Sequence, residues 1–180
     1  MPAVEVRPAT NSDFNLILSM DLGYMSPRVW QMERLNDEGQ MGVRFNEVRL
    51  PREARIEYPR TAGQILDESI PEKHVILTAS SEGQLVGFAR IAEHVFPKTA
   101  WIKDCVVNEP ARRRGIGTAL LVGVQEWAME RNFRRLTMEL QSKNYPGVQL
   151  AQKMGYAFAG YSDHYYLNQD IALFFTLSLR

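Results

Sequence analysis

The chain has 180 residues, with 21 Lys and Arg against 21 Asp and Glu, so its formal net charge is zero. A balanced charge argues against a dedicated nucleic-acid surface, and no apolar run reaches the ~20 residues that a membrane helix needs, so we expect neither partner. The length and a hydrophobic content of 45% predict one globular domain over residues 1–180 with a real core. A single cysteine and an N-terminus without a secretory pattern favour a cytoplasmic location.

The first part of the chain gives mixed signals. Residues 4–7 predict a strand, and residues 10–13 offer N-cap side chains for a helix. Pro27, followed by apolar residues at helical spacing, predicts a second helix. Residues 43–50 alternate as a strand does, whereas residues 52–69 fit no single element.

The rest of the chain shows clearer periodicity. In chain order we expect strands at 74–79, 84–92 and 99–107, a helix at 118–130, a strand at 134–141, a helix at 147–154 ended by Gly155, and strands at 157–161 and 171–179. Antiparallel hairpins followed by β-α-β units predict an α/β fold with one central sheet covered by helices.

A basic, glycine-containing loop lies between the strand at 99–107 and the helix after it. Its sequence is Arg112-Arg113-Arg114-Gly115-Ile116-Gly117, followed by Thr118. Gly115 and Gly117 let backbone N–H groups approach a ligand, and the helix start adds unpaired donors and a positive dipole. Arginine forks match phosphate oxygens. The loop therefore predicts a pyrophosphate site, although by itself it also fits a solvated turn, and it matches neither a P-loop nor G-x-G-x-x-G.

In this context the loop resembles the acetyl-CoA signature of the GNAT superfamily of N-acetyltransferases, Gln/Arg-x-x-Gly-x-Gly/Ala. A second set of residues resembles the family's next strand and helix: Met138-Glu139-Leu140-Gln141, Asn144, Leu150, Lys153, Gly155 and Tyr156. The last third is similar to the streptothricin acetyltransferase branch. The resemblance runs from about Lys73 to the C-terminus. It implies a mixed, mostly antiparallel sheet in which the parallel strands at 99–107 and 134–141 splay apart to admit the cofactor.

The resemblance also implies acetyl-CoA as co-substrate, a small amine as acceptor and no metal. The positions that it assigns to cofactor binding are Cys105, Val106, Val107, Arg112, Arg113, Arg114, Gly115, Ile116, Gly117, Thr118 and Asn144. Asn144 also fits an N-cap, and both roles are compatible.

Two positions depart from the family pattern. Where many members carry a Tyr that protonates the CoA thiolate, this chain has Ala151. Where the streptothricin branch has an acidic residue before an Asp, it has Lys103. These changes indicate a changed mechanism or acceptor, and they make Tyr145, near the expected cofactor, a candidate acid.

Asp104 and Glu139 are the candidate catalytic carboxylates, one on each splayed strand. Glu139 stands between apolar residues, so it fits either a cleft or a salt-bridged strand position. Both carboxylates would suit a small cationic amine. Regular alternation predicts two faces for the first strand, with Lys103 and Cys105 on one and Ile102, Asp104 and Val106 on the other.

Other polar groups leave alternatives open. His94, beside Glu93, fits a tuned base or a surface residue. The segment 161–166 is rich in hydroxyl groups and fits an acid, the wall of an amine pocket or aromatic packing. Cys105 lies in an apolar strand with no neighbouring His, which favours a structural thiol over a nucleophile.

The sequence thus predicts direct acetyl transfer from acetyl-CoA to a primary amine of a small molecule. The alternative is a CoA-binding regulatory module with little turnover, in keeping with Ala151. Exposed edges of the closing strands would support a homodimer.

Overall fold

A seven-stranded sheet forms the centre of the computed structural model, which describes residues 3–67 and 73–180. Its strands, in spatial order, are β1 (Val4–Pro8), β4 (His74–Ser81), β5 (Gln84–Phe96), β6 (Thr99–Val107), β7 (Arg135–Gln141), β9 (Ala172–Ser178) and β8 (Ala157–Ser162). Among the strands of the described residues, only β6 and β7 pair in parallel, and the other neighbours pair antiparallel. The predicted mixed sheet is therefore confirmed.

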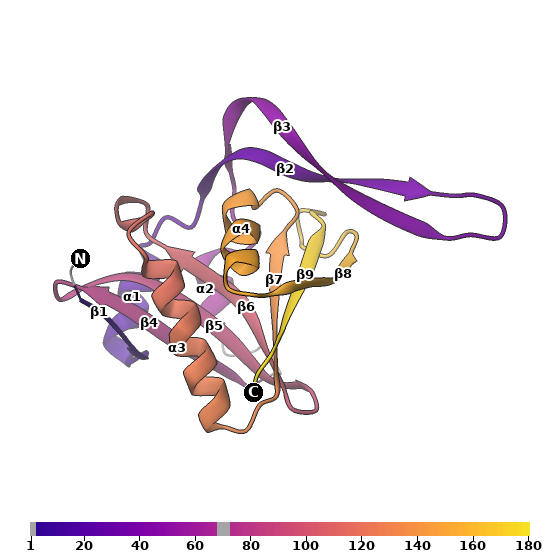
Figure 1. Ribbon diagram of the computed structural model, residues 1–180. Coiled ribbons are helices and arrows are strands. Elements are labelled where there is room, and N and C mark those ends of the chain that lie inside the picture. The colour runs from indigo at the N-terminus through magenta and orange to yellow at the C-terminus, as the bar shows by residue number, and fades with distance from the viewer. Residues whose placement is uncertain (1–2, 68–72) are drawn as a thin grey trace.

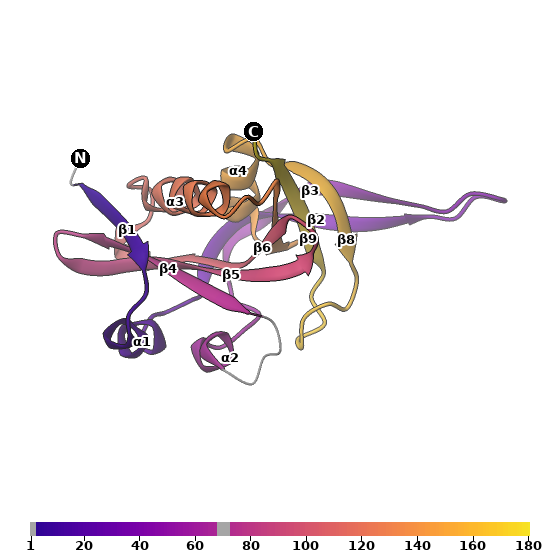
Figure 2. The ribbon, with the colours of Figure 1, turned by 90° about the horizontal axis from the view of Figure 1, so that it is seen from below.

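Helices cover both faces of this sheet (Figure 2). One face carries α3 (Ile116–Glu130) and α4 (Tyr145–Lys153), and the other carries α1 (Asn11–Leu18) and the short α2 (Ala62–Leu66). An apolar cluster lies beneath the helices on each of these two faces. Within the described residues, no helix has the length and apolar character needed to cross a membrane.

The larger cluster lies between the sheet and the α3–α4 layer. Leu120, Leu121 and Val124 are fully buried there, because α3 turns this stripe toward Ile102 and Leu136 of the sheet. Each such aliphatic side chain stabilises the fold by about 1.5–3 kcal/mol. The smaller cluster, on the α1–α2 side, centres on Ile17, Ile65, Phe88 and Val106.

The two parallel strands separate partway along their length (Figure 1). Their register runs from Thr99 opposite Arg135 to Ile102 opposite Met138 and then stops. Beyond that point β6 still pairs with β5, and β7 still pairs with β9. The predicted splay between these strands is confirmed.

A β-bulge in β6 changes which side chains reach each face. Arg90 pairs with Asp104 and the next residue of β5, Ile91, pairs with Ile102, so Lys103 is the extra residue. Ile102 and Cys105 therefore pack toward α3, whereas Lys103 and Asp104 reach the opposite face. The predicted pairing of Lys103 with Cys105, and of Ile102 with Asp104, was wrong because regular alternation breaks at this bulge.

A long hairpin replaces the second helix that Pro27 predicts. Strands β2 (Tyr24–Leu35) and β3 (Gly42–Ile56) pair antiparallel and project beyond the main sheet (Figure 1). Pro27 stands at a break in the β2–β3 register, between Ser26 and Arg28, where a missing N–H is tolerated. The helix was wrong because the apolar residues after Pro27 pair across strands, as Met32 does with Phe45. The strand expected at 43–50 is confirmed.

Candidate active site

The basic loop ends in a left-handed glycine that caps α3. Gly115 has φ +81°, a conformation that glycine adopts without strain, and α3 begins at the next residue. A Cβ at Gly115 would meet nothing within 4 Å, whereas one at Gly117 would lie 2.8 Å from Leu150 Cδ2 of α4. The N–H groups of Ile116 to Thr118, which have no partner within the helix, therefore lie next to an open turn.

The three arginines of the loop are placed differently from one another. Arg112 donates through Nε to Val107 O (2.9 Å) and through Nη2 to Gly23 O (2.7 Å), so it ties the loop to β6 and to the start of the hairpin. Burial lowers the pKa of Arg112. Arg113 and Arg114 are exposed on the loop.

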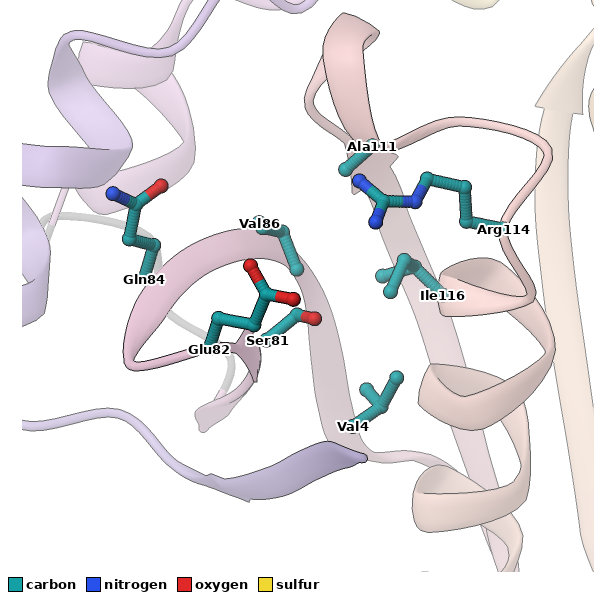
Figure 3. Close-up of a pocket in the computed structure, with 8 residues that line it drawn as sticks. All are labelled: Val4, Ser81, Glu82, Gln84, Val86, Ala111, Arg114 and Ile116. Atoms are coloured by element: carbon teal, nitrogen blue, oxygen red, sulfur yellow. The ribbon is translucent and has the colours of Figure 1, made fainter. Parts of the chain in front are cut away.

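A small hollow lies beside Arg114, between the loop and the β4–β5 turn (Figure 3). Arg114, Ile116 and Glu82 are among the residues that line it. Its volume of about 60 Å³ is enough for a few water molecules and too small for a nucleotide.

Three of the residues that the resemblance assigns to cofactor binding lie along the opening between β6 and β7. Cys105, Val106 and Val107 follow the last β6–β7 pair and remain bound to β5. Burial and the nearby Asp104 charge raise the pKa of the Cys105 thiol to about 12, so this thiol stays neutral. That environment favours the structural interpretation of Cys105 over a nucleophile.

At the start of α4, Asn144 acts as the N-cap. Its Oδ1 accepts a hydrogen bond from Gly147 N at 2.9 Å. The next residue, Tyr145, is half-buried, and the Arg28 guanidinium lies 5.8 Å from its ring centroid. Ala151, where the family Tyr would stand, is fully buried in the core.

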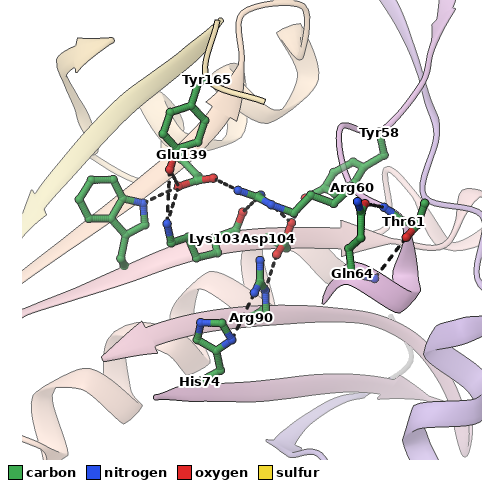
Figure 4. Close-up of polar contacts among 11 residues, drawn as sticks. Tyr58, Arg60, Thr61, Gln64, His74, Arg90, Lys103, Asp104, Glu139 and Tyr165 are labelled. Atoms are coloured by element: carbon green, nitrogen blue, oxygen red, sulfur yellow. Dashed lines mark hydrogen bonds and ion pairs between the residues drawn. The ribbon is translucent and has the colours of Figure 1, made fainter. Parts of the chain in front are cut away.

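Glu139 is the centre of a buried polar network (Figure 4). Its carboxylate is fully buried and accepts hydrogen bonds from Arg60, Trp101 Nε1 (2.8 Å) and Tyr165 OH (2.9 Å). Lys103 Nζ lies 3.3 Å from its Oε2. Glu139 therefore combines the two interpretations that the sequence left open, since it is both salt-bridged and located at the opening.

Asp104 is the second buried carboxylate of the network. Its Oδ1 accepts from Tyr58 OH (2.8 Å) and Arg60 Nη1 (3.1 Å), and its Oδ2 accepts from Arg90 Nε (2.6 Å). Burial acts to lower the pKa of Arg60, but the charges of Asp104 and Glu139 raise it above its ordinary value. Arg60 thus stays charged and joins the two carboxylates.

The segment 161–166 contributes tyrosines to this site. Tyr165 bonds to Glu139, and the Tyr166 ring lies 5.1 Å from the Arg60 guanidinium. His164 is exposed and lies 3.7 Å from Asp163. The side chain of His94 lies outside the described part of the structure.

Sequence reasoning missed Tyr58, Arg60 and Trp101. Tyr58 and Arg60 come from the stretch at 52–69 that fits no element, and they reach the site just before α2. One signal was available: two carboxylates in apolar strands demand a buried cation. No local pattern, however, identifies the residue that provides this cation. Ser69 and Pro71, at the end of that stretch, lie outside the described residues.

Comparisons with known proteins agree with this geometry. A model of the acetyltransferase (GNAT) family matches residues 43–156. Streptothricin acetyltransferase of Streptomyces lavendulae is 24% identical over 160 residues, which are 87% of this chain and 82% of that protein.

Solved structures share the whole fold. A nourseothricin acetyltransferase superposes with a TM-score of 0.83 at 21% identity, covering 99% of each chain. A proposed streptothricin acetyltransferase from Bacillus anthracis, solved with acetyl coenzyme A, gives 0.75 at 18% identity and covers 98% of this chain and 99% of its own. The family match favours an enzyme over a regulatory module with little turnover. Since that match spans well over half of the sequence, the chain belongs to the GNAT family of acetyltransferases.

Proposed function

We propose that this chain is an acetyl-CoA-dependent N-acetyltransferase that transfers the acetyl group directly to a primary amine of a small molecule. The observation that carries the proposal is the β6–β7 opening next to the glycine-capped start of α3. The opening would admit the extended arm of the co-substrate, and the helix start would favour its anionic end. A relative with the same fold binds acetyl coenzyme A.

The residues present fit this co-substrate. We assign the pyrophosphate to the loop from Arg112 to Thr118, where Gly115 leaves open space and Arg113 and Arg114 supply exposed charge. The backbone from Cys105 to Val107, which lacks β7 as a partner, would run beside the pantetheine arm, with Asn144 across the opening. Arg112 contributes by holding the loop in place through Val107 O and Gly23 O.

For the chemistry, we assign proton acceptance from the amine to Glu139. It lies one residue past the last β6–β7 pair, and Tyr165 OH donates to it at 2.9 Å. Because the Tyr165 hydroxyl is hydrogen-bonded to this carboxylate, it can relay a proton from the amine to Glu139. The neutral amine then attacks the thioester carbon, a carbon–nitrogen bond forms as the carbon–sulfur bond breaks, and the proton lost by the nitrogen balances the one taken up by the leaving CoA thiolate.

Asp104 and Tyr145 have supporting roles in this proposal. Asp104 pairs with Arg60 as well as with Tyr58 and Arg90, so it acts by positioning Arg60 against Glu139. Tyr145 begins α4 and is the candidate donor to the thiolate, in place of the family Tyr that Ala151 replaces.

The test is calorimetric titration of acetyl-CoA into the wild type and into a matched pair of variants. Gly115→Asn and Gly115→Asp both place a side chain that tolerates φ > 0 into space free of neighbours. They differ only in charge, so repulsion of the pyrophosphate should weaken binding at least ~10-fold more in the Asp variant than in the Asn variant. Gly39→Asp, at another open left-handed glycine in the hairpin turn, is the remote control.

Equal affinities for the Asp and Asn variants would move the pyrophosphate away from this loop. No binding by the wild type would remove acetyl-CoA from the proposal altogether. If acetyl-CoA binds, thiol release with a panel of primary amines tests turnover. The expected homodimer, the cytoplasmic location and the single-domain organisation stay predictions of the sequence.

A further inference from the structure

An open groove lies on the same face of the sheet as Glu139, toward the paired end of β6 and β7. Its volume is about 460 Å³. The residues that line it are Phe96, Pro97, Thr99, Trp101, Arg135, Thr137, Ala159, Phe174 and Thr176. They come from the β5–β6 turn and from β6, β7, β8 and β9, so the groove is formed by the sheet itself.

The lining has a distinct chemistry. Phe96 stacks on Trp101 with ring centroids 6.0 Å apart, and Phe174 meets Trp101 edge to face at 5.3 Å. Three threonines and Arg135 also line the groove. Among the described residues that line the groove, none is acidic. Such a surface suits an apolar or aromatic body and offers an anion a partner, but offers a cation none.

Trp101 connects the groove to the proposed reaction site. Its ring lines the groove, while its Nε1 donates to Glu139. Arg135, Thr137 and Glu139 alternate on one face of β7, so Arg135 stands about 13 Å from Glu139 along the strand. A ligand in the groove therefore has Arg135 near one end, and near the other end Trp101 lies between the ligand and the buried Glu139.

At the Glu139 end, the chain already supplies an ammonium group. Lys103 Nζ lies 3.3 Å from Glu139 Oε2, donates to Tyr165 OH at 3.3 Å, and is 5.2 Å from the Trp101 ring centroid. A carboxylate, a phenol and an indole together make a cage of the kind that binds substrate ammonium groups. Lys103 is only 13% exposed and fills that cage.

Charge in the wider network points the same way. Asp104 and Glu139 face the cations Arg60, Arg90 and Lys103, so the buried carboxylates are already neutralised by the protein. The Glu139 end therefore offers an ammonium group no free carboxylate, and Lys103 would repel it, so the reacting amine enters this end uncharged.

We propose that this groove binds the acceptor, and that the acceptor is a primary amine on an apolar or aromatic body that carries one anionic group and no second cation. This inference rests on the proposed acetyl transfer and specifies its substrate class. The reacting amine lies at the Glu139 end, the body lies against Phe96, Trp101 and Phe174, and the anion faces Arg135. A second cation at that far end would meet Arg135 as a like charge, so Arg135 is the specificity residue that disfavours dications.

The test uses three amines with one skeleton: 2-phenylethylamine, its para-carboxylate and its para-trimethylammonium derivative, whose second cation cannot be acetylated. With acetyl-CoA saturating, kcat/KM is measured from thiol release. We expect the carboxylate to exceed the neutral amine by about three- to fivefold, the range of an exposed ion pair. The trimethylammonium compound should fall below both.

Variants assign these preferences to residues. Arg135→Gln should bring the carboxylate-to-neutral ratio toward one, whereas Arg134→Gln, at an exposed neighbour that does not line the groove, should leave the ratio as it is. Arg135→Gln should also raise the trimethylammonium-to-neutral ratio, because the like charge at that end is then removed. Urea unfolding of each variant checks that it is folded.

A binding measurement separates this proposal from the proposed function. The carboxylate amine should quench tryptophan fluorescence saturably in the wild type, and the quenching should be lost in Trp101→Phe. Acetylation of all three amines with the dication preferred, or an unchanged ratio in Arg135→Gln, would overturn the substrate class while leaving acetyl transfer intact. If no amine is acetylated, saturable quenching still supports the groove, and its absence overturns it. Failure to bind acetyl-CoA would instead remove the proposed function.

Discussion

The two sides of the β6–β7 opening are built in different ways. The α3 side consists of consecutive residues, and it presents backbone groups around Gly115 at a helix start. The Glu139 side is assembled from side chains that are far apart in the sequence, from Arg60 to Tyr165. Backbone construction leaves a short, readable motif, whereas a side-chain network exists only after folding. The two sides should therefore respond differently to substitution.

The largest expected effect is on stability, on the side-chain side. Asp104→Ala would leave Arg90, whose side chain is 3% exposed, without its buried partner. Removing one member of a buried ion pair costs about 3–5 kcal/mol, and we expect that loss in the free energy of unfolding measured with urea.

Asp163→Ala is the matched control. Asp163 binds Arg34, whose side chain is 63% exposed, so the loss there should stay below about 1 kcal/mol. Equal effects of the two variants would mean that the network does not depend on its burial, and the contrast between the two sides would be lost.

The next effect is on catalysis. Glu139→Gln keeps the shape of the side chain but removes the proposed proton acceptor, and we expect kcat to fall about 100-fold. KM for acetyl-CoA should change little, because that ligand is assigned to the opposite side of the opening. Steady-state kinetics at several pH values measures both constants.

Glu33→Gln provides the comparison for that variant, since Glu33 pairs with Arg44 at 3.6 Å on the projecting hairpin. It should leave both kinetic constants as they are. A fully active Glu139→Gln enzyme would reduce Glu139 to a structural partner of Arg60 and Lys103.

The smallest effect concerns Cys105, on the backbone side. Its native pKa is raised to about 12 by burial first and the Asp104 charge second. Above the ordinary thiol pKa of about 8.5, the unfolded chain releases a proton that the native state keeps, so stability falls as pH rises toward 12. Between pH 7.5 and 9.5 this group should lower the free energy of unfolding by about 1 kcal/mol.

Other groups titrate in the same window, so the quantity to compare is the pH-dependent loss in the wild type and in Cys105→Ala. The variant should lose about 1 kcal/mol less over that interval. Identical losses, together with rapid labelling of the native thiol at pH 8, would show Cys105 to be an accessible thiolate instead.

The sequence predicted much of the fold because local patterns were sufficient there. The strand–loop–helix unit around Gly115 and the hairpin of β4 and β5 follow from period and turn residues, and the splayed parallel strands follow from the family resemblance. The hairpin of β2 and β3 was not predicted, because the spacing of the apolar residues Val29, Trp30 and Met32 fits a helix as well as a strand. Cross-strand pairing, as between Met32 and Phe45, decides the outcome and is not a local property.

The same distinction applies to the candidate site. Glu139 and Asp104 could be chosen from sequence because a charge in an apolar strand is conspicuous. Arg60 could not, since it lies after Pro59 in a stretch without periodicity and gains its meaning only from two carboxylates brought to it. The bulge at Lys103 was equally hidden, because it depends on how β5 is registered against β6.

That bulge has a consequence for how the activity of this enzyme can change. Lys103 is the extra residue between two register pairs, so it has no counterpart on β5 that a new side chain would have to match. A single codon can thus change the charge presented to the acceptor without a matching change on β5. Because Lys103 also pairs with the buried Glu139, the stability that such a change costs would be lost at that carboxylate and not in the pairing of the sheet.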